Sequence, residues 1–116
     1  MKQANCDKGF CGVEETVRII GRKWTLLILR ELFDGTKRFN ELQRGLPGVS
    51  PRTLSQRLQQ MEGDGIVDKK IFPEVPPHVE YNLTDKGRTS SRIICDMREW
   101  GERSQVKEEA REAVSV

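Results

Sequence analysis

Apolar residues recur at helical spacing through the first half of the chain. Val13, Val17 and Ile20 follow the i, i+4, i+7 pattern of a short amphipathic helix. The next stretch, "KWTLLILRELF", is apolar nearly all round a helical wheel, which is typical of a buried central helix. "FNELQRGLPG" predicts a third, short helix with Leu42 and Leu46 turned inward.

A fourth helix is predicted over "SPRTLSQRLQQME", residues 50–62. Ser50 suits the N-cap because its side-chain oxygen can accept a hydrogen bond from a free backbone N–H. Pro51 suits the first turn because proline lacks a donor that would have no partner there. At 100° per residue, three apolar side chains fall in a sector of about 60° that predicts the buried side: Leu54, Leu58 and Met61.

After Gly65 the pattern changes from helical to alternating. "IVDKKIF" and "VEYNL" are rich in β-forming residues and flank the proline-rich turn "PEVPPH", which predicts an antiparallel hairpin. Thr84 is a candidate cap for one last long helix. Four helices, a hairpin and a helix predict a winged helix-turn-helix, mainly α with a small antiparallel β-hairpin (α+β class).

The chain predicts one domain with two extensions. We expect a flexible arm over residues 1–10, the winged helix-turn-helix domain over 11–103, and a charged tail over 104–116. The tail is helix-permissive, and ends of this kind often fray. A chain of 116 residues is long enough for one ordinary core and too short for two.

The side of the fourth helix opposite its apolar residues is rich in hydrogen-bond donors and has no carboxylate before Glu62. Arginine pairs with guanine and glutamine with adenine, while serine and threonine bond bases or phosphate. The simpler interpretation is an ordinary solvated face, since Gln and Arg are good helix formers. The helix-turn before it and the hairpin after it favour DNA contact through Ser50, Arg52, Thr53, Ser55, Gln56, Arg57 and Gln59.

Further cations are candidate phosphate contacts, and scattered surface charge is an equally good interpretation of Lys37 and Arg38. Lys37 and Arg38 precede the third helix, and Lys69 and Lys70 lie on the first hairpin strand. His78 follows the proline turn, where a wing tip can approach the minor groove; a solvated histidine is the alternative. Residues 1–70 hold 13 basic against 9 acidic side chains and residues 71–116 hold 7 against 9, a mild basic bias that permits nucleic-acid binding.

Several classes of protein do not fit this sequence. It has no apolar run of about 18 residues for a membrane span and no apolar signal segment near its start, so we expect a cytoplasmic protein. A single histidine and the absence of a nucleophile–base pair or phosphate-binding glycine loop predict no enzyme activity, no metal site and no cofactor. An odd number of cysteines argues against a disulfide scaffold.

The terminal helices predict a homodimer. Ile93, Met97 and Trp100 form an apolar stripe on the last helix, and a chain this small more often buries such a stripe against a second copy. The first helix is expected to join the same interface through Val13 and Val17.

Several motifs in register resemble one family. They are the Cys11-Gly-x-Glu14 opening, "IIGRKWTLLILRELFDGTKRFNEL", "LPGVSPRTLSQRL", "GDGIVDKK", "PEVPPHVEYNLTDKG" and "EWGER". Together they cover about residues 11–103 and resemble the HxlR-type winged-helix regulators, relatives of the MarR group. The resemblance implies a transcription regulator that binds a pseudo-palindromic operator on double-stranded DNA as a homodimer, with residues 50–62 in the major groove and the tip of the hairpin, residues 72–79, as the wing.

The resemblance has two departures. Family members usually have proline after the first cysteine, where this chain has Gly12, and the wing often carries arginine or lysine at the position of His78. The second departure puts minor-groove contact by His78 in doubt.

The cysteines suggest a second role. Several members of the family sense oxidants or electrophiles through a cysteine that matches Cys11. The helix dipole and Lys8 would favour its thiolate, whereas Glu14 and Glu15 oppose it. Cys6, or Cys95 of either subunit, could resolve an oxidised Cys11; the alternative is that Cys11 and Cys95 are packing residues. The effector would be an oxidant or another small molecule.

A different function class remains open. A winged helix can serve as a protein–protein interaction module without sequence-specific DNA binding, and the modest net charge and acidic C-terminal third are compatible with it.

Overall fold

The computed structural model describes the backbone of residues 11–114 and the side chains of residues 11–105. The predicted order of four helices, a hairpin and a C-terminal helix is present, with an additional short strand before the third helix and a division of the last helix into two. The elements are α1 (Gly12–Ile20), α2 (Lys23–Leu32), β1 (Lys37–Arg38), α3 (Phe39–Gly45), α4 (Pro51–Gly63), β2 (Val67–Phe72), β3 (His78–Leu83), α5 (Asp85–Arg88) and α6 (Ser91–Val114). The fold is therefore mainly helical with a small antiparallel sheet, as the sequence predicts.

The core lies where α2, α3 and α4 meet the base of the hairpin. Ile28 and Leu29 of α2 are fully buried, which confirms the prediction of a central helix. The inward residues predicted for α3 and α4 are also buried: Leu42, Leu46, Leu54, Leu58 and Met61. Burying such side chains supplies the main favourable free energy of folding, so the α4 side chains on this side act as its anchor.

The sheet has one strand more than expected. β2 and β3 form the predicted antiparallel hairpin, and β1 adds to the other edge of β3, giving the order β1-β3-β2. Lys37 pairs with Tyr81 and Arg38 with Glu80. β1 has only two residues, which is too short for an alternating pattern to appear in the sequence. It forms because the edge of β3 that β2 does not occupy is free to pair with it.

The C-terminal part differs from a single long helix. Thr84 does act as a cap, since its Oγ1 accepts a hydrogen bond from the Gly87 N–H at 3.0 Å, but the helix it caps is the four-residue α5. A new helix, α6, then begins at Ser91 and continues to Val114, through most of the helix-permissive tail predicted for residues 104–116.

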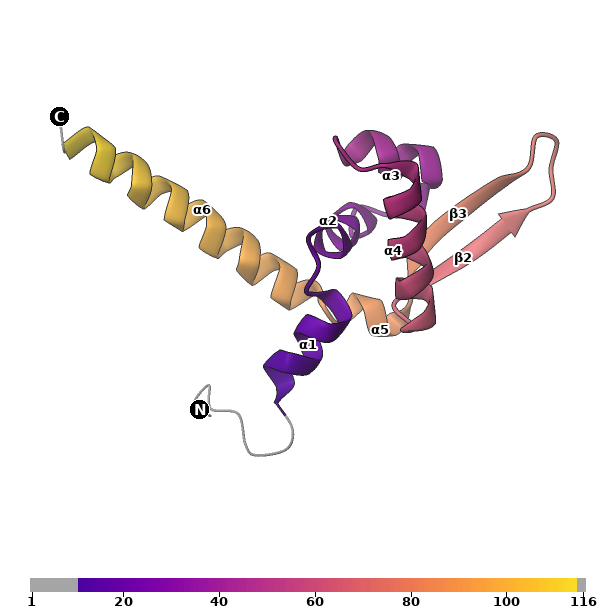
Figure 1. Cartoon of the computed structure of the whole chain (residues 1–116), viewed down its shortest axis with the longest axis horizontal. Coiled ribbons are helices and arrows are strands. Elements are labelled where there is room, and N and C mark those ends of the chain that lie inside the picture. The colour runs from indigo at the N-terminus through magenta and orange to yellow at the C-terminus, as the bar shows by residue number, and fades with distance from the viewer. Residues whose placement is uncertain (1–10, 115–116) are drawn as a thin grey trace.

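Figure 1 shows how these elements are distributed in space. α6 extends away from the rest of the fold as a single long helix, and the β2–β3 hairpin projects on the opposite side. α4 lies beside the hairpin, and α1 lies near the base of α6. The molecule thus carries its predicted DNA-contacting elements at one end and its predicted dimer helices at the other.

Candidate nucleic-acid interface

The N-terminal end of α4 is built as the sequence predicts. Ser50 Oγ accepts a hydrogen bond from the Thr53 N–H at 3.1 Å and lies 2.9 Å from Thr53 Oγ1. Pro51 occupies the first turn, which contains no acidic residue. The positive end of the helix dipole is therefore not offset by a nearby carboxylate, an arrangement that favours an anionic ligand.

The two sides of α4 are separated as the helical wheel indicates. Arg52, Gln56 and Gln59 are exposed, together with Ser50 and Ser55, whereas Thr53 is half-buried. Arg57 is also half-buried: its Nη1 donates to Gln60 Oε1 at 3.4 Å, and its Nε is covered by the protein without a hydrogen-bond acceptor. Arg57 is therefore less available to a ligand than the three exposed side chains.

The wing carries its cations on β2. Lys69 and Lys70 are exposed, and Lys70 Nζ lies 5.0 Å from the centroid of the Phe72 ring. The tip itself holds no cation: it consists of residues 73–77, "PEVPP", with Val75 fully exposed. Contact of this wing with a phosphate would therefore come from the strand rather than from the tip.

His78 does not point outward as a wing-tip residue would. Its ring stacks on Phe72 with centroids 4.5 Å apart, and its side chain is only 16% exposed. Nδ1 lies 3.4 Å from Glu74 Oε2 and Nε2 lies 3.1 Å from Glu80 Oε2. Two carboxylates beside the imidazole disfavour a phosphate there, so His78 braces the base of the tip and we leave it out of the proposed DNA contacts.

A polar hollow separates α4 from the wing. It has a volume of about 240 Å³ and is lined by Ser55, Leu58, Gln59, Glu62, Lys69 and Tyr81. Burial raises the pKa of Tyr81, and the charge of Glu62 acts in the same direction, so the phenol stays protonated and able to donate. The sequence shows Tyr81 only as an inward residue of an alternating strand, so no local signal marks it as part of this surface.

Lys37 and Arg38 lie at the opposite edge of β3 from β2. Arg38 is exposed, while Lys37 is half-buried. The Arg38 backbone N–H donates to Glu41 Oε1 at 2.8 Å, which fixes the start of α3. The predicted cations are thus split between the two edges of the small sheet rather than gathered in one patch.

The two cysteines that the structure describes lie at α1 and on α6 rather than on α4 or the hairpin. Cys11 is the N-cap residue of α1, half-buried and disulfide-bonded. Cys95 is an exposed free thiol on α6. Cys6 lies outside the described residues. Among the described residues, no group of three His, Cys, Asp or Glu side chains could hold a metal ion.

The residues predicted for dimerisation are exposed. Val13 and Val17 of α1 face solvent, as do three residues of α6: Ile93, Met97 and Trp100. Trp100 is 68% exposed, which is unusual for a tryptophan that has no ligand or partner. None of the described helices is long and apolar enough to cross a membrane.

Comparison with known proteins identifies the family. Residues 19–109 match the HxlR-like helix-turn-helix model. YybR of Bacillus subtilis, described as an uncharacterized HTH-type transcriptional regulator, is 45% identical over 96 residues that cover 83% of this chain and 77% of YybR. YtfH of Escherichia coli, described in the same terms, is 38% identical over 100 residues, covering 86% of this chain and 79% of YtfH.

Solved structures give the same result. The redox regulator HypR in its reduced form superposes with a TM-score of 0.79 at 43% identity, covering 84% of this chain and 97% of HypR. The reduced form of the transcriptional regulator YodB from B. subtilis gives a TM-score of 0.71 at 34% identity, covering 81% of this chain and 93% of YodB. The chain therefore belongs to the HxlR-like helix-turn-helix family of transcriptional regulators.

Proposed function

We propose that this regulator binds a pseudo-palindromic DNA operator as a homodimer, with α4 of each subunit in a major groove. The observation that carries the proposal is the construction of α4. Its apolar side is anchored in the core, its opposite side exposes Arg52, Gln56 and Gln59, and its first turn holds no acid. A helix of this kind beside a projecting hairpin is the arrangement with which winged helices enter DNA.

The remaining polar residues divide by position. Ser50, Thr53 and Ser55 lie around the exposed side of α4 and are proposed as supporting contacts to bases or phosphate. Lys69 and Lys70 on the wing, and Lys37 and Arg38 at the other sheet edge, are proposed as phosphate contacts that orient the protein without selecting sequence. Arg57 is half-buried, so we propose that it contributes less to DNA contact than the exposed side chains of α4.

The homodimer is proposed from the exposed stripe on α6. Ile93, Met97 and Trp100 line a shallow hollow with Asp96, and a large apolar face on a monomer usually marks an interaction site. A second copy is the partner we propose, because operators with two-fold symmetry require two α4 helices placed about one DNA turn apart.

The function is tested by selecting duplexes from a random-sequence pool at low salt. We expect enrichment of one sequence with inverted half-sites. Its affinity should fall by about 10³–10⁵ between 50 and 200 mM salt if six to ten phosphates are contacted. If no duplex is enriched, the regulator would act through protein contacts instead, which is the alternative function that a winged helix allows.

We also propose that the thiol–disulfide state of Cys11 controls operator affinity. Two features of the structure support it: Cys11 is the N-cap of α1, and it is disulfide-bonded. Two similar proteins also support it, because HypR is described as a redox regulator and YodB was crystallised after treatment with diamide. In the proposed reaction two thiols lose two protons and two electrons to an oxidant such as diamide and join as a disulfide. Cys6, or Cys95 of either subunit, is the proposed resolving residue; Cys95 is a free thiol here, so it is not the partner in the disulfide that Cys11 forms in this structure.

Oxidation is expected to weaken operator binding. Allosteric coupling typically changes affinity about 5- to 150-fold, so we expect a loss in that range when the reduced protein is treated with diamide. Cys11→Ser should cancel the loss, and Cys6→Ser and Cys95→Ser assign the resolving thiol. The measurement is operator affinity by fluorescence anisotropy before and after oxidant. Equal affinity in the two states would remove the redox role while leaving DNA binding intact.

A further inference from the structure

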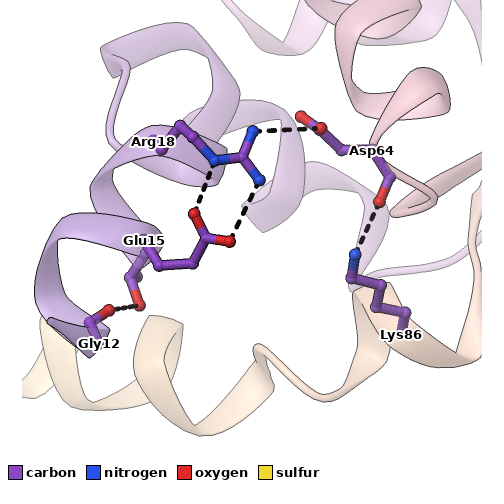
Figure 2. A network of polar contacts seen from close by, with 6 residues as sticks. Gly12, Glu15, Arg18, Asp64 and Lys86 are labelled. Atoms are coloured by element: carbon purple, nitrogen blue, oxygen red, sulfur yellow. Dashed lines mark hydrogen bonds and ion pairs between the residues drawn. The ribbon is translucent and has the colours of Figure 1, made fainter. Parts of the chain in front are cut away.

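The turn that follows α4 is held from two sides by elements distant in sequence. It consists of residues 64–66, and Gly65 adopts a φ of 75° that glycine tolerates without strain. Figure 2 shows Arg18 of α1 and Lys86 of α5 both directed at Asp64, the residue that ends α4. The end of α4 closes through its own backbone, because the N–H groups of Asp64, Gly65 and Ile66 donate to carbonyls in its last turn. Arg18 and Lys86 hold the turn in addition.

On the first side, α1 reaches this turn through an ion-pair chain. Arg18 Nη1 lies 3.7 Å from Asp64 Oδ1, and Arg18 Nε donates to Glu15 Oε1 at 2.6 Å. The hydrogen bond to Arg18 lowers the pKa of Glu15, and the same bond raises the pKa of Arg18. Both groups therefore remain charged near neutral pH, and Glu15 holds the guanidinium in a position from which it can contact Asp64.

On the second side, α5 and its cap bond the backbone of the turn. Lys86 Nζ donates to the Asp64 carbonyl at 3.0 Å, Thr84 Oγ1 donates to the Gly65 carbonyl at 2.5 Å, and the Thr84 N–H donates to the Ile66 carbonyl at 2.9 Å. α5 also packs closely here, because a Cβ on Gly87 would lie 2.2 Å from the Ile66 carbonyl oxygen. The three carbonyls of the turn, which follow the last turn of α4, therefore accept hydrogen bonds from Thr84 and Lys86.

We propose that Arg18, Thr84 and Lys86 are positioning residues that set the orientation of α4 relative to α1 and α6. The inference rests on the proposed function and goes beyond it, because none of the three residues is placed against DNA. Cys11 is the N-cap of α1, and α6 follows α5 after two residues. The turn is therefore the point where the helix next to Cys11 and the proposed dimer helix are connected to the proposed DNA-contacting helix.

The length of α4 is the reason why we expect weak contacts at its C-terminal end to change DNA recognition more than folding stability. Exposed ion pairs contribute little to folding stability, and Arg18 is more than half exposed. α4 has 13 residues and is about 20 Å long, so a tilt of roughly 6° at its C-terminal end moves its N-terminal end by about 2 Å. Hydrogen bonds to base edges tolerate only a few tenths of an ångström, so such a tilt disrupts base contacts while the fold stays intact.

The test compares operator discrimination among variants of the full chain. Discrimination is the ratio of the affinities for the selected operator and for a scrambled duplex, so changes in overall charge cancel. Arg18→Gln and Asp64→Asn should each lower this ratio about three- to tenfold, with nearly unchanged melting temperatures, and the double variant should lose no more than the larger single effect. Arg18→Lys should retain most of the ratio, because the charge is kept.

Arg88→Gln is the matched control, since it removes the same charge from an exposed residue of α5 outside these contacts. It should leave the ratio at the wild-type value. The positioning role is overturned if Arg18→Gln keeps full discrimination, or if the effects of Arg18→Gln and Asp64→Asn simply add. If the wild-type protein prefers no duplex, the proposed function fails and the positioning role fails with it. If the wild-type protein prefers the operator and the variants prefer it equally, only the positioning role is overturned.

Discussion

Replacing Arg52 and Gln56 together by alanine is expected to abolish the preference for the operator while leaving a folded dimer. Both side chains are exposed on the side of α4 opposite the core, so their loss removes no packing. A bidentate contact from arginine to guanine or from glutamine to adenine is worth about 1–3 kcal/mol of discrimination. The double variant should therefore lose about 2–6 kcal/mol per half-site, measured as the difference in binding free energy between operator and scrambled duplex.

A second double variant separates base contacts from phosphate contacts. Lys69→Ala with Lys70→Ala changes two exposed cations on β2. It should weaken binding to every duplex by a similar factor and reduce the dependence of affinity on salt, while preserving discrimination. For the first double variant, Arg52→Ala with Gln56→Ala, an unchanged ratio of operator to scrambled-duplex affinity would show that a different surface selects the sequence.

Substituting Met97 and Trp100 by glutamine is expected to dissociate the proposed dimer. Both side chains are largely exposed in the single chain, so the monomer should keep its fold and melting behaviour. A buried interface tryptophan commonly contributes 2 kcal/mol or more to association. Once the subunits are separate, the second half-site no longer benefits from an effective concentration near the millimolar range, and operator affinity should fall by about 10²–10⁴.

The oligomeric state is measured by analytical ultracentrifugation and operator affinity by anisotropy. Glu102→Gln is the control, because Glu102 is exposed and lies on the opposite side of α6 from this stripe at 100° per residue. If the Met97 and Trp100 double variant remains dimeric, the dimer interface lies elsewhere. If the wild-type protein is monomeric at micromolar concentration, the proposed homodimer is wrong.

Local patterns in the sequence predict much of the fold. Helical periodicity identifies α4, because Leu54, Leu58 and Met61 share one side whatever the rest of the chain does. Ser50 and Pro51 fix its start by chemistry that acts within one turn. The alternating residues and the proline-rich turn likewise predict the hairpin from local sequence. Two features have no local pattern that predicts them: β1, which is too short, and the break between α5 and α6.

The tertiary structure alone decides how the site is arranged. His78 is turned inward by Phe72 and two carboxylates, and Tyr81 lines a hollow facing α4. Lys86 bonds the end of α4 from 22 residues away along the chain. The sequence by itself determined which helix presents donors to solvent, since that follows from spacing within one element. Only packing between distant elements decided where that helix is held, because such contacts depend on distances that no local pattern encodes.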